Sequence, residues 1–202
     1  MLSPIVISIL MALAYYLAPQ ILKYRKQLYV GVWFVLAAII ALRGKPFVTP
    51  FVKGFVGFAF FYVVMITGAL NPSWKLTKKL RSVRAPYSIL GFVLLMSHPL
   101  NYVAEVLSKQ RDIPYFGVAA FLIMVPLFIT SYMAIRKKMK AQTWVKLQRW
   151  AYPVYALMLI HLLVNASSPQ NRIVAILLFV PYIGMKVHKE FIAKRKIDTA
   201  QA

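Results

Sequence analysis

The sequence of 202 residues is 61% hydrophobic, contains no cysteine and carries a formal net charge of +21. Without cysteine, the chain has no disulfide, thiolate-bound metal or iron–sulfur cluster of its own. The charge does not indicate nucleic-acid binding, because the basic residues lie in short stretches between long apolar runs, where they act as membrane-topology signals.

Apolar runs of this length are typical of membrane-spanning helices. Seven spans are expected, in chain order at 2–19, 28–42, 54–70, 86–106, 115–134, 150–165 and 172–187. The second run is short, so six spans remain an alternative. No linker or low-complexity tract marks a second domain. We therefore predict an all-α fold, a polytopic transmembrane helix bundle in which residues 1–202 form a single membrane domain.

The distribution of lysine and arginine predicts the orientation of the bundle. Nineteen of these residues fall in the stretches 23–26, 75–84 and 136–149 and in the tail from 186 onward, whereas six fall in the alternate loops. Because cytoplasmic loops carry the excess of positive charge, we expect a multi-pass protein of the cell (plasma) membrane with a cytoplasmic C-terminus. The first segment lacks a basic start, so it is interpreted as a retained helix with its N-terminus outside.

Two histidines are expected at the same depth in the membrane. His98, in "LLMSHPLNYV" (94–103), follows Pro86 by about 18 Å along a helix, and His161 follows Trp150 by about 16 Å. Both segments run outward, so both imidazoles reach the outer half of the membrane. The four acidic residues of the chain lie elsewhere, at positions 105, 112, 190 and 198. Two neutral imidazoles without a carboxylate suit a haem iron held between them.

Three other interpretations of this histidine pair stay open. Each imidazole can simply hydrogen-bond a backbone carbonyl of a neighbouring helix. A zinc site is a second alternative, although zinc requires further Cys, His or carboxylate ligands. A proton relay is the third, although such relays usually include Asp or Glu.

The two histidine-bearing segments, "RAPYSILGFVLLMSHPLNYV" (84–103) and "WVKLQRWAYPVYALMLIHLL" (144–163), resemble the ferric reductase-like transmembrane family, and most closely its MsrQ (YedZ)-type haem-binding membrane subunits. The resemblance rests on Leu90–Gly91, His98 and Tyr102, followed by "FITS" (128–131) and "RKKMKAQTW" (136–144). It covers about residues 50–190, so the helix at about 2–19 is an addition to the family core. The resemblance implies a haem b with His98 and His161 as axial ligands.

One departure from the family concerns a second haem nearer the cytoplasm. Two-haem relatives would place its ligands at Arg84 and Gln148, and neither residue type ligates iron well. Arg84 is therefore interpreted either as a topology anchor or as a clamp on a haem propionate, flavin phosphate or quinone oxygen. Gln148 is either a helix-end residue or a cofactor contact, and Trp150 is either an interfacial residue or packs on a planar cofactor. His188, in "KVHKEF", is either solvated or a substitute haem ligand.

These expectations lead to a functional hypothesis. The sequence contains neither a G-x-G-x-x-G motif nor a P-loop, so we expect the chain to depend on another protein to oxidise a nicotinamide. It would be the electron-transfer subunit of an oxidoreductase, embedded in membrane lipid. Electrons would come from a cytoplasmic flavin reductase or a quinol, with FMN or a quinone bound at the inner side. They would pass to an extracytoplasmic oxidoreductase or another acceptor. The alternative is a non-redox transporter or an assembly or scaffold subunit.

Overall fold

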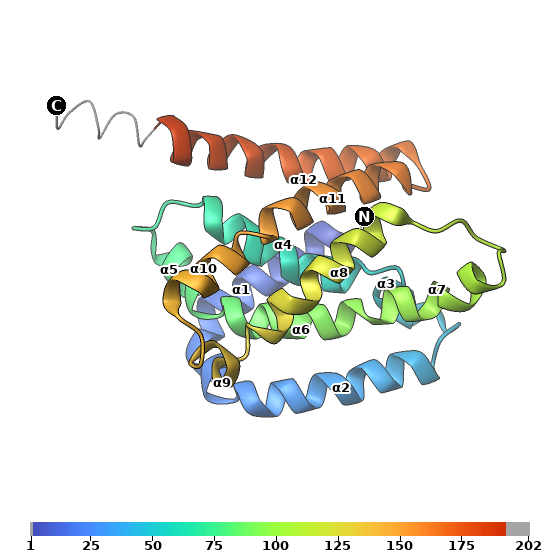
Figure 1. Ribbon diagram of the computed structural model, residues 1–202, viewed down its shortest axis with the longest axis horizontal. Helices are drawn as coiled ribbons and strands as arrows, with labels where there is room; N and C mark the ends of the chain where they lie inside the picture. The colour runs from blue at the N-terminus through green and yellow to red at the C-terminus, as the bar shows by residue number, and fades with distance from the viewer. Residues whose placement is uncertain (1, 193–202) are drawn as a thin grey trace.

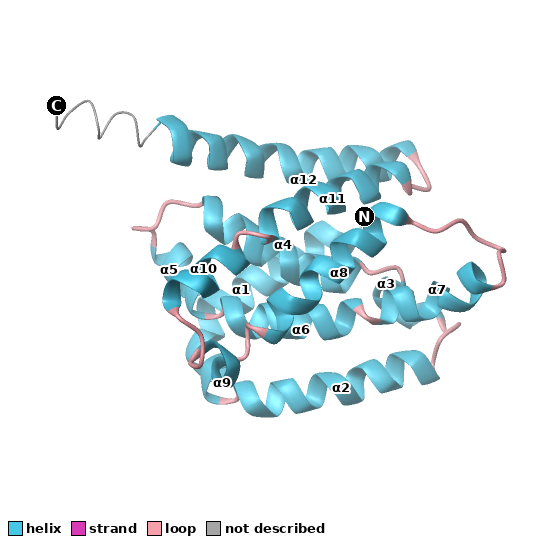
Figure 2. Cartoon of the chain, viewed as in Figure 1, coloured by secondary structure: helices cyan, strands magenta, loops and turns pink. Residues whose placement is uncertain are grey.

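The computed structural model describes residues 2–192, and every regular element in that range is helical. Short loops connect the helices, as Figure 2 shows. The elements are α1 (Leu2–Lys23), α2 (Arg25–Ala41), η1 (Pro46–Val48), α3 (Thr49–Val52), α4 (Phe55–Ala69), α5 (Lys75–Ser82), α6 (Arg84–Leu95), α7 (Ser97–Leu107), α8 (Tyr115–Ile129), α9 (Met133–Arg136), α10 (Ala141–Gln148), α11 (Ala151–Val164), α12 (Pro169–Val187) and the π-helix η2 (His188–Ile192). The all-α fold class is therefore confirmed.

Each of the seven expected spans coincides with a helix or a pair of helices. Fewer than seven of these helices are long enough to cross a membrane. Within residues 2–192, two helices are long and apolar enough to cross a membrane, Ser3–Lys23 and Arg84–Leu107. A third candidate, Pro46–Val52 with Phe55–Ala69, is bent by 44° at its break. Tyr115–Ile129 is apolar but shorter. The fourth expected span consists of α6 and α7, which adjoin at Met96.

The long helices lie side by side, so the bundle has two distinct ends (Figure 1). One end, here called the basic end, carries the short helices α5, α9 and α10. The opposite end carries the loops 108–114 and 165–168 and the segment before α3. The stretches 75–84 and 136–149, expected as loops, are largely helical: α5 covers 75–82 and α10 covers 141–148, and residues 137–140 form the turn before α10. In α5, Thr77 and Leu80 share a buried face while Lys75 and Lys78 stay exposed, which is the spacing of an amphipathic helix.

Helix α4 forms the centre of the core, and it packs against α1, α6 and α12. A Cβ on Gly57 would lie 2.8 Å from the Cα of Leu95, so the absence of a side chain lets α4 and α6 approach closely. Tyrosines join the surrounding helices: Tyr87 Oη donates to the Leu10 carbonyl at 2.8 Å and Tyr62 Oη to the Leu178 carbonyl at 2.9 Å. These hydrogen bonds join α1 and α12 to the core.

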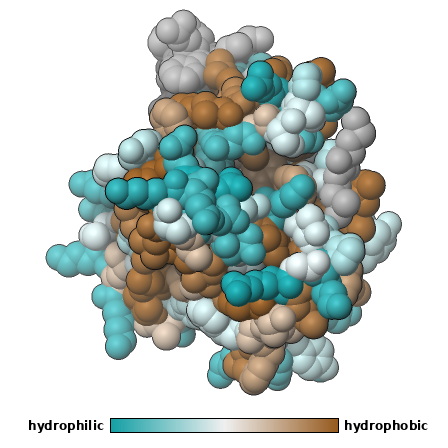
Figure 3. Space-filling view, turned by 90° about the vertical axis from the view of Figure 1, so that its right-hand side faces the viewer, coloured by the Kyte–Doolittle hydropathy of each residue, from teal (hydrophilic) through white to brown (hydrophobic). Residues whose placement is uncertain are grey.

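The outer surface of the bundle is rich in large apolar side chains. Phe34 of α2, Leu122 of α8 and Leu177 of α12 are 72%, 63% and 65% exposed. Soluble proteins rarely expose contiguous apolar surface of this kind, whereas it matches the lipid chains of a bilayer. Figure 3 views the opposite end, where polar side chains cross the middle of the face and apolar ones lie beside and below them.

Candidate functional site

The two expected histidines lie next to each other. The ring centres of His98, on α7, and His161, on α11, are 6.1 Å apart, with the ring planes at 77°. A metal–imidazole bond of about 2.0–2.1 Å on each side, plus the reach from each nitrogen to its ring centre, gives a spacing of about 6 Å. A spacing of 6.1 Å is thus compatible with two imidazoles that share one metal ion, and it is equally that of a T-shaped contact between the rings. The two residues are 63 positions apart in the sequence.

The ring of His98 is held by the backbone around the break between α3 and α4. Its Nδ1 lies 2.9 Å from the Val52 carbonyl oxygen, which can only accept, so Nδ1 carries the proton and Nε2 keeps a free electron pair. Gly54 has φ +77°, and a Cβ there would lie 3.3 Å from His98 Cγ. Glycine therefore meets both requirements of this corner, a left-handed backbone and room for the ring. The Tyr102 ring lies edge-on at 5.2 Å.

The ring of His161 lies directly against the backbone of α8. A Cβ on Gly117 would be 2.7 Å from His161 Cε1 and 2.8 Å from its Nδ1. On the other side, Asn165 Nδ2 lies 3.2 Å from Nδ1 and donates to the His161 carbonyl at 2.9 Å. With the amide nitrogen facing it, Nδ1 accepts and Nε2 holds the proton. Turning the amide would present its oxygen to an Nδ1 proton and free Nε2 for a metal.

The surroundings of this pair fit haem better than zinc. Within the residues that the structure describes, no three His, Cys, Asp or Glu side chains are grouped to hold a metal ion. Two imidazoles alone leave the tetrahedral coordination of zinc incomplete, whereas a porphyrin supplies four more nitrogens. Both rings also rest on glycines whose Cβ atoms would fill the space they occupy. The donor set is thus that of two axial imidazoles of a haem, and the glycines provide the room for the imidazole rings.

A second candidate site lies toward the basic end, where Arg84 of α6 and Gln148 of α10 meet. Both residues line a cavity of about 320 Å³, a volume that includes its opening. Gln148 Nε2 donates to Thr130 Oγ1 at 3.2 Å. The sequence thus predicted two residues of this cavity. Trp150 does not line it and is 55% exposed, and exposed His188 does not line it either.

Sequence reasoning missed the part of this cavity that α12 contributes, Tyr182 and Lys186. Tyr152 and Tyr155 of α11, which like Trp150 were candidates to pack on a planar cofactor, line it beside them. The Tyr155 and Tyr182 ring centres are 5.9 Å apart, and Lys186 Nζ pairs with Glu190 at 2.6 Å. The spacings of three and four residues within each helix place these side chains on one face, which was the available signal. Nothing in the sequence indicated that the two helices bring these faces together.

Comparisons with known proteins found distant relatives. An uncharacterized protein of Treponema pallidum (strain Nichols) is 27% identical over 164 residues, covering 71% of this chain and 45% of that protein. The magnetosome protein MamZ of Magnetospirillum gryphiswaldense is 28% identical over 134 residues, and MamZ of Paramagnetospirillum magneticum is 26% identical over the same length. Both alignments cover 60% of this chain and 21% of MamZ. The chain thus spans less than half of each relative. No known family profile matches the sequence, and no solved structure matches it.

Proposed function

We propose that this chain is a haem b membrane protein that carries electrons from the cytoplasmic side, or from a quinol, to an acceptor outside. The observation that supports this function is the pair of facing imidazoles with ring centres 6.1 Å apart. His98 and His161 are the proposed axial ligands, and the haem would supply one-electron chemistry when bound. The chain itself fixes the position of the rings through Gly54 and Gly117 and sets the tautomer of His98 through Val52.

We further propose six or seven membrane spans with the basic end in the cytoplasm. The grouping of α5, α9 and α10 at one end supports this orientation, because their lysines and arginines would then lie together on the side that retains positive charge. Lys194, Arg195 and Lys196, which contribute to the charge bias, lie outside the described residues, as does Asp198. In this orientation the histidine pair faces the outer half of the bilayer.

The cavity of Arg84 and Gln148 would then serve the entry of electrons. In this orientation it lies on the donor side and offers a guanidinium, a carboxamide and tyrosine rings to a planar group with anionic or carbonyl oxygens. FMN, a quinone or a second haem with unusual ligation fits that chemistry. A cytoplasmic flavin reductase or a membrane quinol is the proposed donor, and an extracytoplasmic oxidoreductase is a proposed acceptor.

An absorption spectrum tests the proposed function. Protein produced with ample haem and purified in detergent should be red, with the split bands of a low-spin, six-coordinate b-type haem. His98→Ala and His161→Ala should each lose the haem or convert it to high spin, whereas His188→Ala, which changes an exposed histidine, should match the wild type. A colourless wild-type protein, or normal low-spin spectra in both site variants, would contradict the proposal. Colourless protein would favour the transporter or scaffold alternative.

A further inference from the structure

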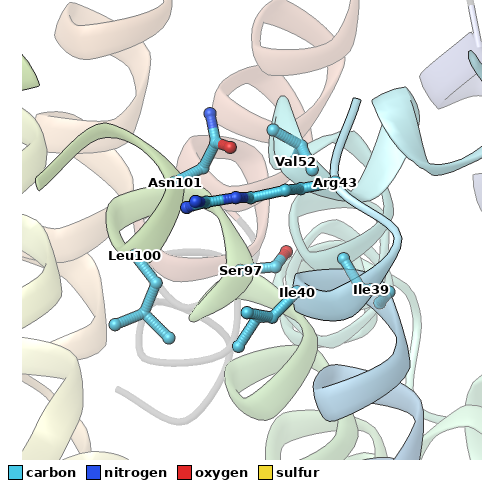
Figure 4. Close-up of a pocket in the computed structure, with 7 residues that line it drawn as sticks. All are labelled: Ile39, Ile40, Arg43, Val52, Ser97, Leu100 and Asn101. Carbon is cyan, nitrogen blue, oxygen red and sulfur yellow. The ribbon is translucent and has the colours of Figure 1, made fainter. Parts of the chain in front are cut away.

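A separate cavity lies at the opposite end of the bundle, between the end of α2 and the start of α7. It measures about 250 Å³ together with its opening, and it is lined by Ile39, Ile40, Arg43, Val52, Ser97, Leu100 and Asn101. Figure 4 shows the Arg43 side chain extended across it, with its guanidinium between the side chains of Asn101 and Ser97. The remaining walls are aliphatic. The cavity therefore combines one cation with a largely apolar lining.

Arg43 has no anionic partner in the described part of the chain. The ion pairs among residues 2–192 join Arg111 to Glu105 and Lys186 to Glu190. No carboxylate lines the cavity. The single proton of the Ser97 hydroxyl is taken up by the carbonyls of Leu94 and Phe51, at 2.7 and 3.0 Å from Oγ. Arg43 and the Asn101 amide are therefore the side-chain donors left for a ligand. An anionic group with several oxygens would match a guanidinium fork of this kind.

The position of Arg43 favours an anion that carries an apolar tail. Arg43 lies two residues beyond α2, which ends at Ala41, and the aliphatic side chains of Ile39 and Ile40 lie in the last turn of that helix. Ile40 and Leu100 are partly exposed, at 41% and 45%. A phosphate at Arg43 would therefore lie at the level of lipid headgroups, with aliphatic side chains directly below it for an acyl chain.

We propose that this cavity binds the phosphate of a phospholipid in the leaflet at this end of the bundle, with Arg43 as its anchor and Asn101 as a second donor. The glycerol and the upper acyl chain pack on Ile39, Ile40 and Leu100. The site shares Val52 with the histidine pair, because the side chain of Val52 lines the cavity while its carbonyl holds His98. The inference is independent of the proposed haem, since it requires only that the opposite end of the bundle reaches a lipid headgroup layer.

Native mass spectrometry of the full chain, released from detergent, tests this site. The wild type should retain about one phospholipid per chain, and Arg43→Gln should reduce that retention at least tenfold. Arg43→Lys should give an intermediate value, because an ammonium keeps the charge but loses the bidentate geometry. Arg172→Gln is the matched control, since it removes an exposed cation from the same end without touching the cavity. Equal retention by Arg43→Gln and the wild type, or equal loss in both Gln variants, would overturn the proposal.

Rebinding to delipidated protein separates a lipid from a soluble anion. Short-chain phosphatidylglycerol should bind the wild type at least tenfold more tightly than inorganic phosphate, and Asn101→Leu should weaken that binding. Equal affinity for the two probes would mean that the aliphatic walls contribute nothing, and the lipid assignment would be wrong. Thermal melting of each variant verifies that it is folded. Lipid retention is measured without reference to haem, so this proposal and the proposed function fail separately.

Discussion

Gly117 and His161 are in such close contact that a methyl group cannot be placed between them: a Cβ on Gly117 would lie 2.7 Å from His161 Cε1. The ring of His161 therefore rests on the backbone of α8 and not on a side chain. Any residue larger than glycine must displace the ring from this position. The geometry of the proposed iron site thus depends on a residue that cannot itself bind metal.

The first prediction follows from this contact. Gly117→Ala should weaken haem binding about 10-fold or shift the haem to high spin, because supporting residues around a metal ligand commonly carry that much affinity. Haem titration of the purified apoprotein measures the effect. Gly184→Ala is the matched control, since a Cβ there meets no atom within 4 Å. Identical titrations for the two variants would show that the ring position at Gly117 is irrelevant to binding.

The second prediction concerns orientation. The chain has no cysteine, so single cysteines can be introduced without background. Met139→Cys, in the basic stretch between α9 and α10, should resist an impermeant thiol reagent in intact cells and react once the cells are opened. Gln110→Cys, in the loop between α7 and α8, should react in intact cells. The reverse pattern would invert the proposed topology.

The third prediction concerns the cavity at the basic end. Arg84→Ala should slow haem reduction by a short-chain quinol or reduced flavin about 10-fold, since a charge-assisted hydrogen bond contributes about 1.5–3 kcal/mol. The low-spin spectrum should stay unchanged, because Arg84 begins α6 and His98 lies beyond the end of that helix, in α7. Arg81→Ala, an exposed arginine outside the cavity, is the control.

Wild-type reduction rates in Arg84→Ala would leave that arginine as a topology anchor only. Haem stoichiometry adds a separate constraint on the same cavity. Two haems per chain would place a second haem at the basic end, and one would leave the cavity to a flavin or a quinone.

The fourth prediction concerns the end of α4. Lys189 Nζ donates to the Gly68 and Leu70 carbonyls at 2.8 and 3.1 Å, where the helix leaves carbonyls unpaired. Lys189→Met should lower the free energy of unfolding by about 1 kcal/mol, measured by thermal melting in detergent. Lys78→Met, an exposed lysine on α5, should change it by less. Equal melting temperatures for the two variants would contradict a role for these bonds.

The contribution of Lys189 to the free energy of unfolding should depend on pH. Burial, together with the nearby Arg81 and Lys186, lowers the pKa of Lys189 below its usual 10.5. The folded protein therefore binds this proton less tightly than the unfolded chain does. Stability contributed by Lys189 should rise as the pH increases from the lowered pKa toward 10.5, and the difference between wild type and Lys189→Met should widen over that window. If the stability difference between the wild type and Lys189→Met stays constant over this pH range, Lys189 has the same proton affinity in the folded and the unfolded chain.

Sequence periodicity and length predicted the helices well, because apolar runs bounded by basic residues leave few alternatives to a helix in lipid. The equal depth of His98 and His161 could also be predicted from the sequence. The two helices run in the same direction, and each histidine lies a similar number of residues from the start of its helix. Depth alone says nothing about which faces of the helices meet. For that reason Gly54, Gly117 and Asn165, which surround the two rings, were not identified from the sequence.

The short helices and the cavity walls were harder to predict for different reasons. Lysine-rich stretches such as 75–84 have the composition of loops, and their helices form because residues such as Leu80 are buried against α1 and α4. Trp150 was expected at the cavity because of its residue type, but the turn between α10 and α11 leaves it exposed while Tyr152 lines the wall. Contacts between segments decide such details, and they leave no local pattern.

The 44° bend between α3 and α4 has a further consequence for His98. In an uninterrupted helix the carbonyl of Val52 would point along the helix axis and accept from the amide four residues later, so a side chain would have to share it. The interruption at Gly54 releases that oxygen, and His98 Nδ1 takes it. The orientation of the His98 ring is therefore coupled to the break in the backbone: straightening this helix would turn the Val52 carbonyl away from Nδ1 and weaken the contact. For the proposed haem, a movement at this helix junction would then change the redox potential without the movement of any charged group.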